Sequence, residues 1–350
     1  MNIFNQQLLH ILTMIKELNN DKRVQQLFMR RNISKNREDA YKIVLGDIYK
    51  LTNKTPSKLI NDAKKEQEPY IVNNKIIFTS IEDRTITETF FKYYIYLINV
   101  KKVSKATTDS YLKILRSFYN EYDIELPKPI SIPLPHSFLR PDDIPNKRDI
   151  KKAVNDTNNL RDKALVLLMS SSGIRGGDIR NFTVYDFLKA TNIKTISKLL
   201  NTDDIIPCWD FIPSKTQKKG NICITFNTPE ATNAIIDYLR NRNDLKANNP
   251  LFISNKGSND FLSRFTLINI FRKINDELFY KNSNGDRFFH AHILKKFFIN
   301  TCTQNSADPM KVKLLSGHRM GGVHNNYNTI NKIFMKKFYI KLLPKLTMNE

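Results

Sequence analysis

The sequence predicts a mainly α-helical protein with one small antiparallel β-sheet, an α+β fold built in two parts. Apolar residues recur at helical spacing through most of the chain. Two short β-branched or aromatic runs flank a polar turn near residues 205–226, and prolines crowd the segment from Pro127 to Pro145. With 350 residues, 41% of them hydrophobic and 11% aromatic, the chain is long enough for two compact cores.

The N-terminal third consists of amphipathic segments. We expect helices within residues 37–52, 53–68, 87–100 and 105–122. The face of the last helix that we expect to be buried consists of Tyr111, Leu112, Leu115 and Phe118. The prolines that follow cannot continue a helix and favour an extended connection. We therefore predict a helical region over residues 1–126, a proline-rich linker over 127–140 and a second domain over 141–350.

The second domain alternates between helical and extended patterns. The helix predicted over residues 161–172 ends at Gly173, a residue typical of a helix C-terminal cap. The runs 206–214 and 221–227 flank the turn "KTQKKG" and predict a β-hairpin. Helical spacing returns in the remaining segments, which are 146–159, 229–242, 261–279, 292–304, 308–317 and 329–343.

The charge of the chain points to a polyanionic partner. It carries 56 Lys and Arg against 34 Asp and Glu, a formal net charge of +22 with a pI of about 9.7. A polyanion would relieve the repulsion among these positive charges. Nucleic acid is the first partner to consider and an anionic membrane is the second. The three cysteines are far apart and form no CxxC pair, and we read neither a signal peptide nor a membrane span. These features predict a soluble intracellular protein.

Several residues have the chemistry to bind or cleave a phosphodiester. Arg175 lies just beyond Gly173 with Asp178 three residues on, so it either meets an external anion or forms a surface ion pair. Lys215 lies at the predicted hairpin, where a lysine either enters a DNA groove or is simply solvated. In "HAHILKKFF", His292 and Lys295 share a helix face, and Ile293, Leu294, Phe297 and Phe298 supply the buried side.

The last polar cluster of the sequence is "LLSGHRMGGVHNNYN". It places His318 directly after Gly317, with Tyr327 nine residues later. A metal site built from His290, His292, His318 and His324 is a rival interpretation. We do not favour it, because the spacing lacks the i, i+4 ligand pattern and no carboxylate or cysteine stands beside these residues.

The order and spacing of these groups resemble the catalytic domain of the tyrosine recombinases, the phage-integrase and Xer-like enzymes. The matching motifs are "SGIRGGD", "SKT", "HILK", "LSGH" and Tyr327, over residues 140–345. The N-terminal part resembles the family's helical core-binding domain through "SKATTDSYLKILRSFYNEYDIELP". The resemblance implies a site-specific recombinase or integrase, of a virus or mobile element, that works without metal, cofactor or ATP.

The same resemblance implies a role for each group. Tyr327 would form a 3′-phosphotyrosine, Arg175 would grip the phosphate with support from Asp178, and Lys215 would protonate the leaving 5′-oxygen. His292 would either assist proton transfer or hydrogen-bond the phosphate, and His318 would stabilise the charge on the phosphoryl oxygens. Lys295 stands where the family usually has Arg, which keeps the charge but loses the planar fork. That departure leaves three interpretations: a tolerated substitution, a slower enzyme in which Lys296 shares the work, or a relative that no longer cuts.

The resemblance also implies partners. We expect double-stranded DNA and a tetramer on two DNA sites, in the cytoplasm or nucleoid, with the C-terminal helix docking on a neighbouring protomer. That helix carries Ile333, Phe334, Phe338 and Leu342, which equally suit packing on its own core. A type IB topoisomerase-like enzyme and a non-catalytic DNA-binding protein are the rival functions. Tyr339 is the rival nucleophile, although a buried aromatic is expected at its position.

Overall fold

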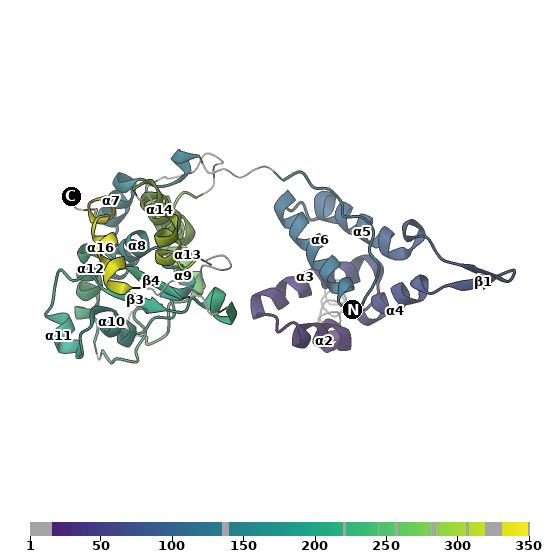
Figure 1. Cartoon of the computed structure of the whole chain (residues 1–350), viewed down its shortest axis with the longest axis horizontal. Helices are drawn as coiled ribbons and strands as arrows, with labels where there is room; N and C mark the ends of the chain where they lie inside the picture. Colours follow the sequence, from purple (N-terminus) through teal and green to yellow (C-terminus); the bar gives the residue numbers. More distant parts are fainter. Residues whose placement is uncertain are drawn as a thin grey trace, which may run out of the picture. The chain divides into compact units, whose positions relative to one another are not determined.

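The computed structural model describes residues 16–134, 140–219, 222–243, 245–255, 258–278, 281, 285, 287–305, 308–318 and 331–348. The chain divides into two compact units, Met1–Ser137 and Phe138–Glu350 (Figure 1). The division falls inside the segment that the prolines mark as a linker. Each unit has its own hydrophobic core.

The N-terminal unit is a helical bundle. Its helices are α2 (Lys22–Arg30), α3 (Lys35–Thr52), α4 (Pro56–Gln67), α5 (Thr85–Ile95) and α6 (Lys105–Asn120), with a 3-10 turn η1 (Ile81–Asp83) and a π-helical turn η2 (Tyr96–Val100). Helix α3 packs against both α5 and α6. On α6, Leu112, Leu115 and Phe118 are buried, which confirms those members of the predicted face, whereas Tyr111 is half-buried.

A β-hairpin in this unit was not predicted from the sequence. Strands β1 (Tyr70–Val72) and β2 (Lys75–Ile77) pair in antiparallel fashion, with Ile71 opposite Ile76. The turn residues Asn73 and Asn74 both have positive φ, 50° and 58°, as a tight two-residue hairpin turn requires. The hairpin projects away from the helices of its unit (Figure 1).

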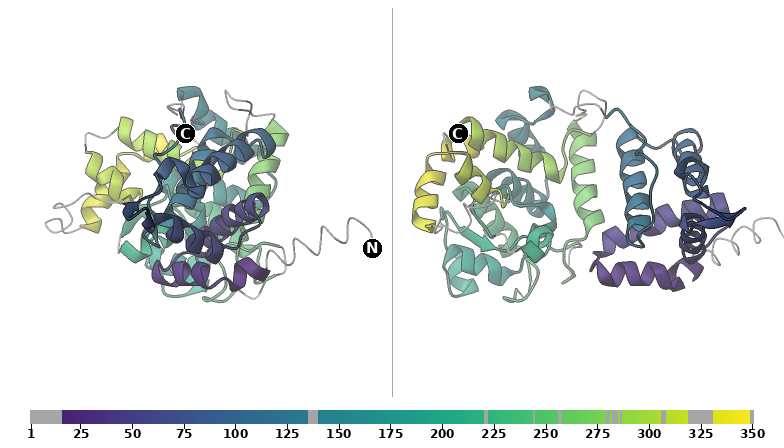
Figure 2. Two further views of the ribbon diagram at one scale, coloured as in Figure 1. Left: turned by 90° about the vertical axis from the view of Figure 1, so that its right-hand side faces the viewer. Right: turned by 45° about the vertical axis from the view of Figure 1, so that its right-hand side comes forward.

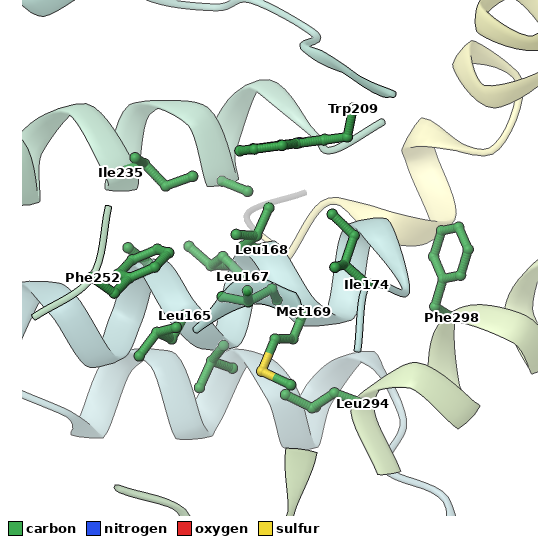
Figure 3. Close-up of a cluster of buried hydrophobic side chains, with 14 of the residues drawn as sticks. Leu165, Leu167, Leu168, Met169, Ile174, Trp209, Ile235, Phe252, Leu294 and Phe298 are labelled. Carbon is green, nitrogen blue, oxygen red and sulfur yellow. The ribbon is translucent and has the colours of Figure 1, made fainter. Parts of the chain in front are cut away.

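The second unit surrounds one buried helix, α8 (Leu160–Ser172). The other helices are α7 (Lys147–Asp156), α9 (Gly176–Ile179), α10 (Val184–Thr191), α11 (Ile196–Leu200), α12 (Pro229–Arg240), α13 (Arg264–Leu278), α14 (Ala291–Gln304), α15 (Pro309–Leu315), α16 (Lys332–Ile340) and α17 (Leu343–Leu346), with a 3-10 turn η3 (Pro141–Asp143). Helix α8 packs against α7, α12 and α14. Its Leu165, Leu168 and Met169 are fully buried among side chains of the neighbouring elements (Figure 3).

The predicted hairpin of the second unit is confirmed. Strands β3 (Cys208–Phe211) and β4 (Cys223–Phe226) are antiparallel, with Cys208 opposite Phe226, and a 3-10 segment η4 (Ser214–Lys219) lies between them. Trp209 of β3 is buried and stacks on Phe182 with ring centroids 4.9 Å apart. This aromatic contact ties the sheet to the core beneath it.

The C-terminal helix α16 packs on its own unit. It contacts β4, and Met335, Tyr339 and Leu342 are buried (Figure 2, yellow). Ile333 and Phe334 remain 70% and 54% exposed. Its apolar residues are therefore divided between the core and the surface. The buried residues fit packing on its own core, and the exposed ones remain free to fit docking on a neighbouring protomer. In the part of the chain that is described, no helix has the length and apolar content that crossing a membrane needs.

Candidate active site

The turn that carries Arg175 begins where α8 ends. Gly173 caps the helix in the left-handed region, with φ of 62°, and its amide donates to Met169 O. A side chain at this position would collide with Phe298, because a Cβ would lie 2.2 Å from that ring. Two residues further on, the half-buried Arg175 is the N-cap of α9. Its guanidinium makes two long contacts of 3.4 Å to Gly317 O.

Three consecutive carbonyls at the end of α8 accept hydrogen bonds from three other elements. Ser171 O accepts from the hydroxyl of Tyr339 on α16 at 2.8 Å. Ser172 O accepts from Thr225 Oγ1 on β4 at 2.7 Å, and Gly173 O accepts from Lys295 Nζ on α14 at 2.5 Å. The last carbonyls of a helix have no partner inside the helix, so these side chains satisfy groups that would otherwise be buried unpaired.

Asp178 on α9 faces the hairpin rather than Arg175. Its carboxylate is buried, and Oδ1 accepts from the amide and the hydroxyl of Ser214 at 2.8 and 2.7 Å. The other oxygen, Oδ2, is buried without a hydrogen-bond partner among the described residues. The structure shows no ion pair between Asp178 and Arg175 within the described parts of the chain. The sequence therefore identified an acidic residue in the site but not its partner.

Lys215 is exposed in η4, directly after Ser214. We expected it at the end of a strand, but β3 already ends at Phe211 and the lysine belongs to the 3-10 segment of the connection. Because Asp178 holds Ser214 through two hydrogen bonds, the position of Lys215 is fixed on one side by α9. Ser214 is the residue that sequence reasoning missed here, and its place beside the lysine in "SKT" was the available signal.

Helix α14 carries the two groups of the "HAHILKKFF" stretch. Ile293, Leu294, Phe297 and Phe298 are buried, which confirms the predicted apolar side, and His292 is exposed. Lys295 lies differently from our expectation that it faces a phosphate. Its side chain is 2% exposed, and its ammonium donates to Gly173 O at 2.5 Å and to Ser316 O at 2.6 Å. Burial, followed by the charge of Arg175, lowers the pKa of Lys295 to about 8.

His318 follows α15 through Gly317, whose φ is 60°. The amide of His318 donates to Lys313 O at 2.9 Å, which holds the residue to the end of the helix. Burial by surrounding atoms, followed by the charges of Lys295 and Arg175, lowers the pKa of His318 to about 4. His318 as a whole residue remains exposed to solvent. An anion bound in the site would offset the positive charges of the neighbouring residues and so reverse that part of the pKa shift.

The described catalytic candidates form one cationic cluster. Burial, then the charges of Lys296, Lys295, Arg175 and Lys215, lowers the pKa of His292. These groups come from α9, η4 and α14, and His318 adds a fourth element. A site with several cations around two neutral imidazoles is suited to a phosphate, because the anion supplies the missing counter-charge and accepts their hydrogen bonds.

Two of the predicted residues lie outside the described part of the chain, Tyr327 and His324. Tyr339 is described and is fully buried, as expected for its position. Burial raises the pKa of the Tyr339 hydroxyl well above its ordinary value, and that hydroxyl donates to Ser171 O. Within the described residues, no three His, Cys, Asp or Glu side chains are grouped as metal ligands would be.

Comparison with known proteins places the chain in a family. A sequence model of the phage integrase family matches residues 137–333, and the chain belongs to this family. It is a site-specific tyrosine recombinase, as the resemblance of its motifs implied. No curated protein sequence gave a significant match.

Solved structures share the fold. The XerH site-specific recombinase in a post-cleavage complex with its palindromic difH substrate is 14% identical, with a TM-score of 0.53 over 93% of this chain and 86% of that one. The Tn1549 transposon integrase in complex with circular intermediate DNA is 12% identical, with a TM-score of 0.50 over 94% of this chain and 99% of that one. At these identities the comparison establishes the fold of the chain, which matches the predicted α+β class.

Proposed function

We propose that this recombinase cleaves and rejoins double-stranded DNA through a covalent 3′-phosphotyrosine on Tyr327. The observation that supports this proposal best is the clustering of Arg175, His292, His318 and Lys215, in which burial and neighbouring positive charges lower the pKa of both histidines. The chemistry needs a nucleophile, an acid for the leaving group and cations for the phosphoryl oxygens. The cluster supplies the last two, and the motif spacing assigns the first to Tyr327.

In the proposed reaction, cleavage and rejoining each form one phosphoester bond and break another. The Tyr327 oxygen attacks phosphorus, the bond from phosphorus to the 5′-oxygen breaks, and Lys215 gives that oxygen a proton. His292 takes the proton of the tyrosine, since its lowered pKa keeps the imidazole neutral and able to accept one. Rejoining runs the same steps backward, with the 5′-hydroxyl as nucleophile and tyrosine as leaving group. The phosphotyrosine retains the energy of the original bond, so neither ATP nor a metal ion is required.

Arg175 and His318 would bind the non-bridging oxygens. Arg175 can point its fork at the phosphate because its present contacts to Gly317 O are long and weak. Asp178 supports the site indirectly, by holding the start of the turn that carries Lys215. The phosphate would raise the pKa of His318 toward its ordinary range and make the ring a donor.

The proposed partner is duplex DNA contacted by both units. The net charge of +22 suits a polyanion, and the XerH and Tn1549 structures are complexes with a difH substrate and with circular intermediate DNA. We further propose that four protomers assemble on two DNA sites inside the cell, in the cytoplasm or nucleoid. The exposed Ile333 and Phe334 of α16 are the surface that suits such an assembly.

Trapping the covalent adduct tests this function without knowledge of the target sequence. The purified protein is incubated with a pool of nicked duplexes randomised around the nick, and protein-linked DNA is recovered and sequenced. We expect an adduct with the wild type and with Tyr185→Phe, which removes an exposed hydroxyl on α10, and none with Tyr327→Phe. An adduct with Tyr327→Phe would overturn the assignment of the nucleophile.

The adduct-trapping experiment, followed by assays on the recovered DNA site, also distinguishes the rival functions. If the wild type binds the pool but forms no adduct, the protein is a DNA-binding relative that does not cut. If the recovered site gives relaxation of a one-site plasmid but no exchange between two sites, the protein is topoisomerase-like. Exchange between two sites supports recombination.

A further inference from the structure

We infer that Lys295 is a positioning residue that joins the Arg175 turn to the His318 turn, and that it does not bind the phosphate. This inference rests on the proposed function, because it concerns the same site. It departs from the role that the motif alone implies for this position, and it explains why a lysine is suitable there.

The geometry of the ammonium carries the inference. Lys295 Nζ lies 2.5 Å from Gly173 O and 2.6 Å from Ser316 O, and the side chain is 2% exposed. Gly173 is two residues before Arg175, and Ser316 is two residues before His318. One buried cation therefore holds the backbone just ahead of both anion-binding candidates, which lie 143 positions apart in the sequence and are otherwise joined by the long contacts from Arg175 to Gly317 O.

The two acceptors explain why the cation is stable there. Gly173 is the C-cap of α8 and Ser316 is the C-cap of α15. Carbonyls at helix C-termini lack intrahelical donors and carry partial negative charge, so an ammonium between two such ends is favourable. Turning Lys295 toward a phosphate would leave both buried carbonyls without this donor.

The shape of the acceptor pair suits lysine better than arginine. Two carbonyls within 2.6 Å of a single nitrogen fit a compact ammonium with rotatable donors. A planar guanidinium has its donors spread over a fork, and a side chain that is only 2% exposed has little free space around it for the larger group. Replacing Lys295 with arginine should therefore disturb the contacts with Gly173 O and Ser316 O, and it should not create a side chain that binds the phosphate.

A charge-neutral phosphate distinguishes the two roles. Cleavage rates are measured on a duplex with the sequence recovered from the covalent adduct. They are also measured on its methylphosphonate analogue, in which a methyl group replaces a non-bridging oxygen of the phosphate that is cleaved. Lys295→Met should slow cleavage about 100-fold, the scale of a misplaced reacting group, and by the same factor on both substrates. Arg175→Ala should lose much less on the methylphosphonate, because the charge it neutralises is gone. Lys163→Met, on the opposite end of α8, is the matched control and should cleave both as the wild type does.

Three results would overturn the inference. The first is a Lys295→Met defect that disappears on the methylphosphonate, as for Arg175→Ala. The second is a Lys295→Arg protein that cleaves faster than the wild type, which would mean that the position serves the phosphate. The third is a Lys295→Met protein that cleaves normally.

A measurement on the free protein keeps the inference testable if the wild type never forms an adduct and the proposed function fails. Amide hydrogen exchange is followed in residues 173–176 and 312–318 of Lys295→Met and Lys163→Met. We expect exchange in both segments to be about tenfold faster or more in Lys295→Met only, the effect of losing a charged donor. Unchanged exchange in both segments would show that Lys295 does not join them, whatever the protein does to DNA.

Discussion

The carboxylate of Asp178 accepts two hydrogen bonds from Ser214, which lies 36 residues further along the chain. One acidic residue of the Arg175 motif thereby fixes the start of the turn that carries Lys215. The proposed phosphate ligand and the proposed general acid are thus linked through a serine that belongs to neither role. Their relative position is therefore set by a direct contact between α9 and the first residue of η4.

Removing this serine hydroxyl tests the link. We expect Ser214→Ala to slow cleavage about five- to tenfold, because loss of one hydrogen bond to a carboxylate costs about 1 kcal/mol or more and loosens the Lys215 turn. Noncovalent DNA binding should stay unchanged in a filter or anisotropy assay. Thr216→Ala is the matched control, since among the described residues the Thr216 hydroxyl donates to Pro213 O of its own turn, at a long distance of 3.4 Å. Equal rates for the two variants would contradict the link.

Two of the three glycines around Arg175, Gly173 and Gly177, should respond in opposite ways to replacement by alanine. Gly173→Ala forces a left-handed residue and a Cβ against the buried Phe298, so we expect a loss of about 2–5 kcal/mol in the free energy of unfolding. Gly177→Ala places its Cβ in open space within α9 and should be neutral or stabilise by up to about 1 kcal/mol. Urea unfolding curves give both values, and similar curves for the two variants would refute the steric argument.

Acid should destabilise the protein in a window set by His318. The folded pKa of about 4 lies below the ordinary value of 6.5, so between these values the unfolded chain binds the proton and the folded chain does not. Stability is therefore fully present above pH 6.5 and falls as the pH drops toward 4. Thermal unfolding of His318→Gln should show a shallower fall in Tm over this window than the wild type. The same slope in both proteins would exclude His318 as the cause.

Tyr339 offers a prediction that separates packing from catalysis. Tyr339→Phe removes the donor to Ser171 O inside the core, and we expect it to lower the free energy of unfolding by about 1–2 kcal/mol. Adduct formation should persist, because the hydroxyl is buried and has no access to DNA. A Tyr339→Phe protein of normal stability that forms no adduct would reopen its candidacy as the nucleophile.

Much of the fold follows from local signals. Helical periodicity predicted α6 and α8, Gly173 marked the end of α8, and the runs around "KTQKKG" predicted β3 and β4. The β1–β2 hairpin was missed because its strands have only three residues each, too few for an alternation pattern to be read. Its signal was the Asn73–Asn74 pair, which suits the left-handed turn.

The site was predictable as a set of residues but not as a set of contacts. His292 and Lys295 are three positions apart and share a helix face, yet the boundary between core and surface falls between them. Periodicity cannot place that boundary to within one residue. The partners of Lys295 are backbone carbonyls, which carry no side-chain identity for a sequence pattern to record.

The end of α8 gives one further consequence. Tyr339, Thr225 and Lys295 each donate a hydrogen bond to one of three successive carbonyls there, and Tyr339 lies on α16, which begins five positions after Tyr327 in the sequence. The helix that follows the proposed nucleophile in the sequence is therefore hydrogen-bonded to the same end of α8 that leads into Arg175. A substitution that loosens this end of α8 should disturb both α16 and the Arg175 turn.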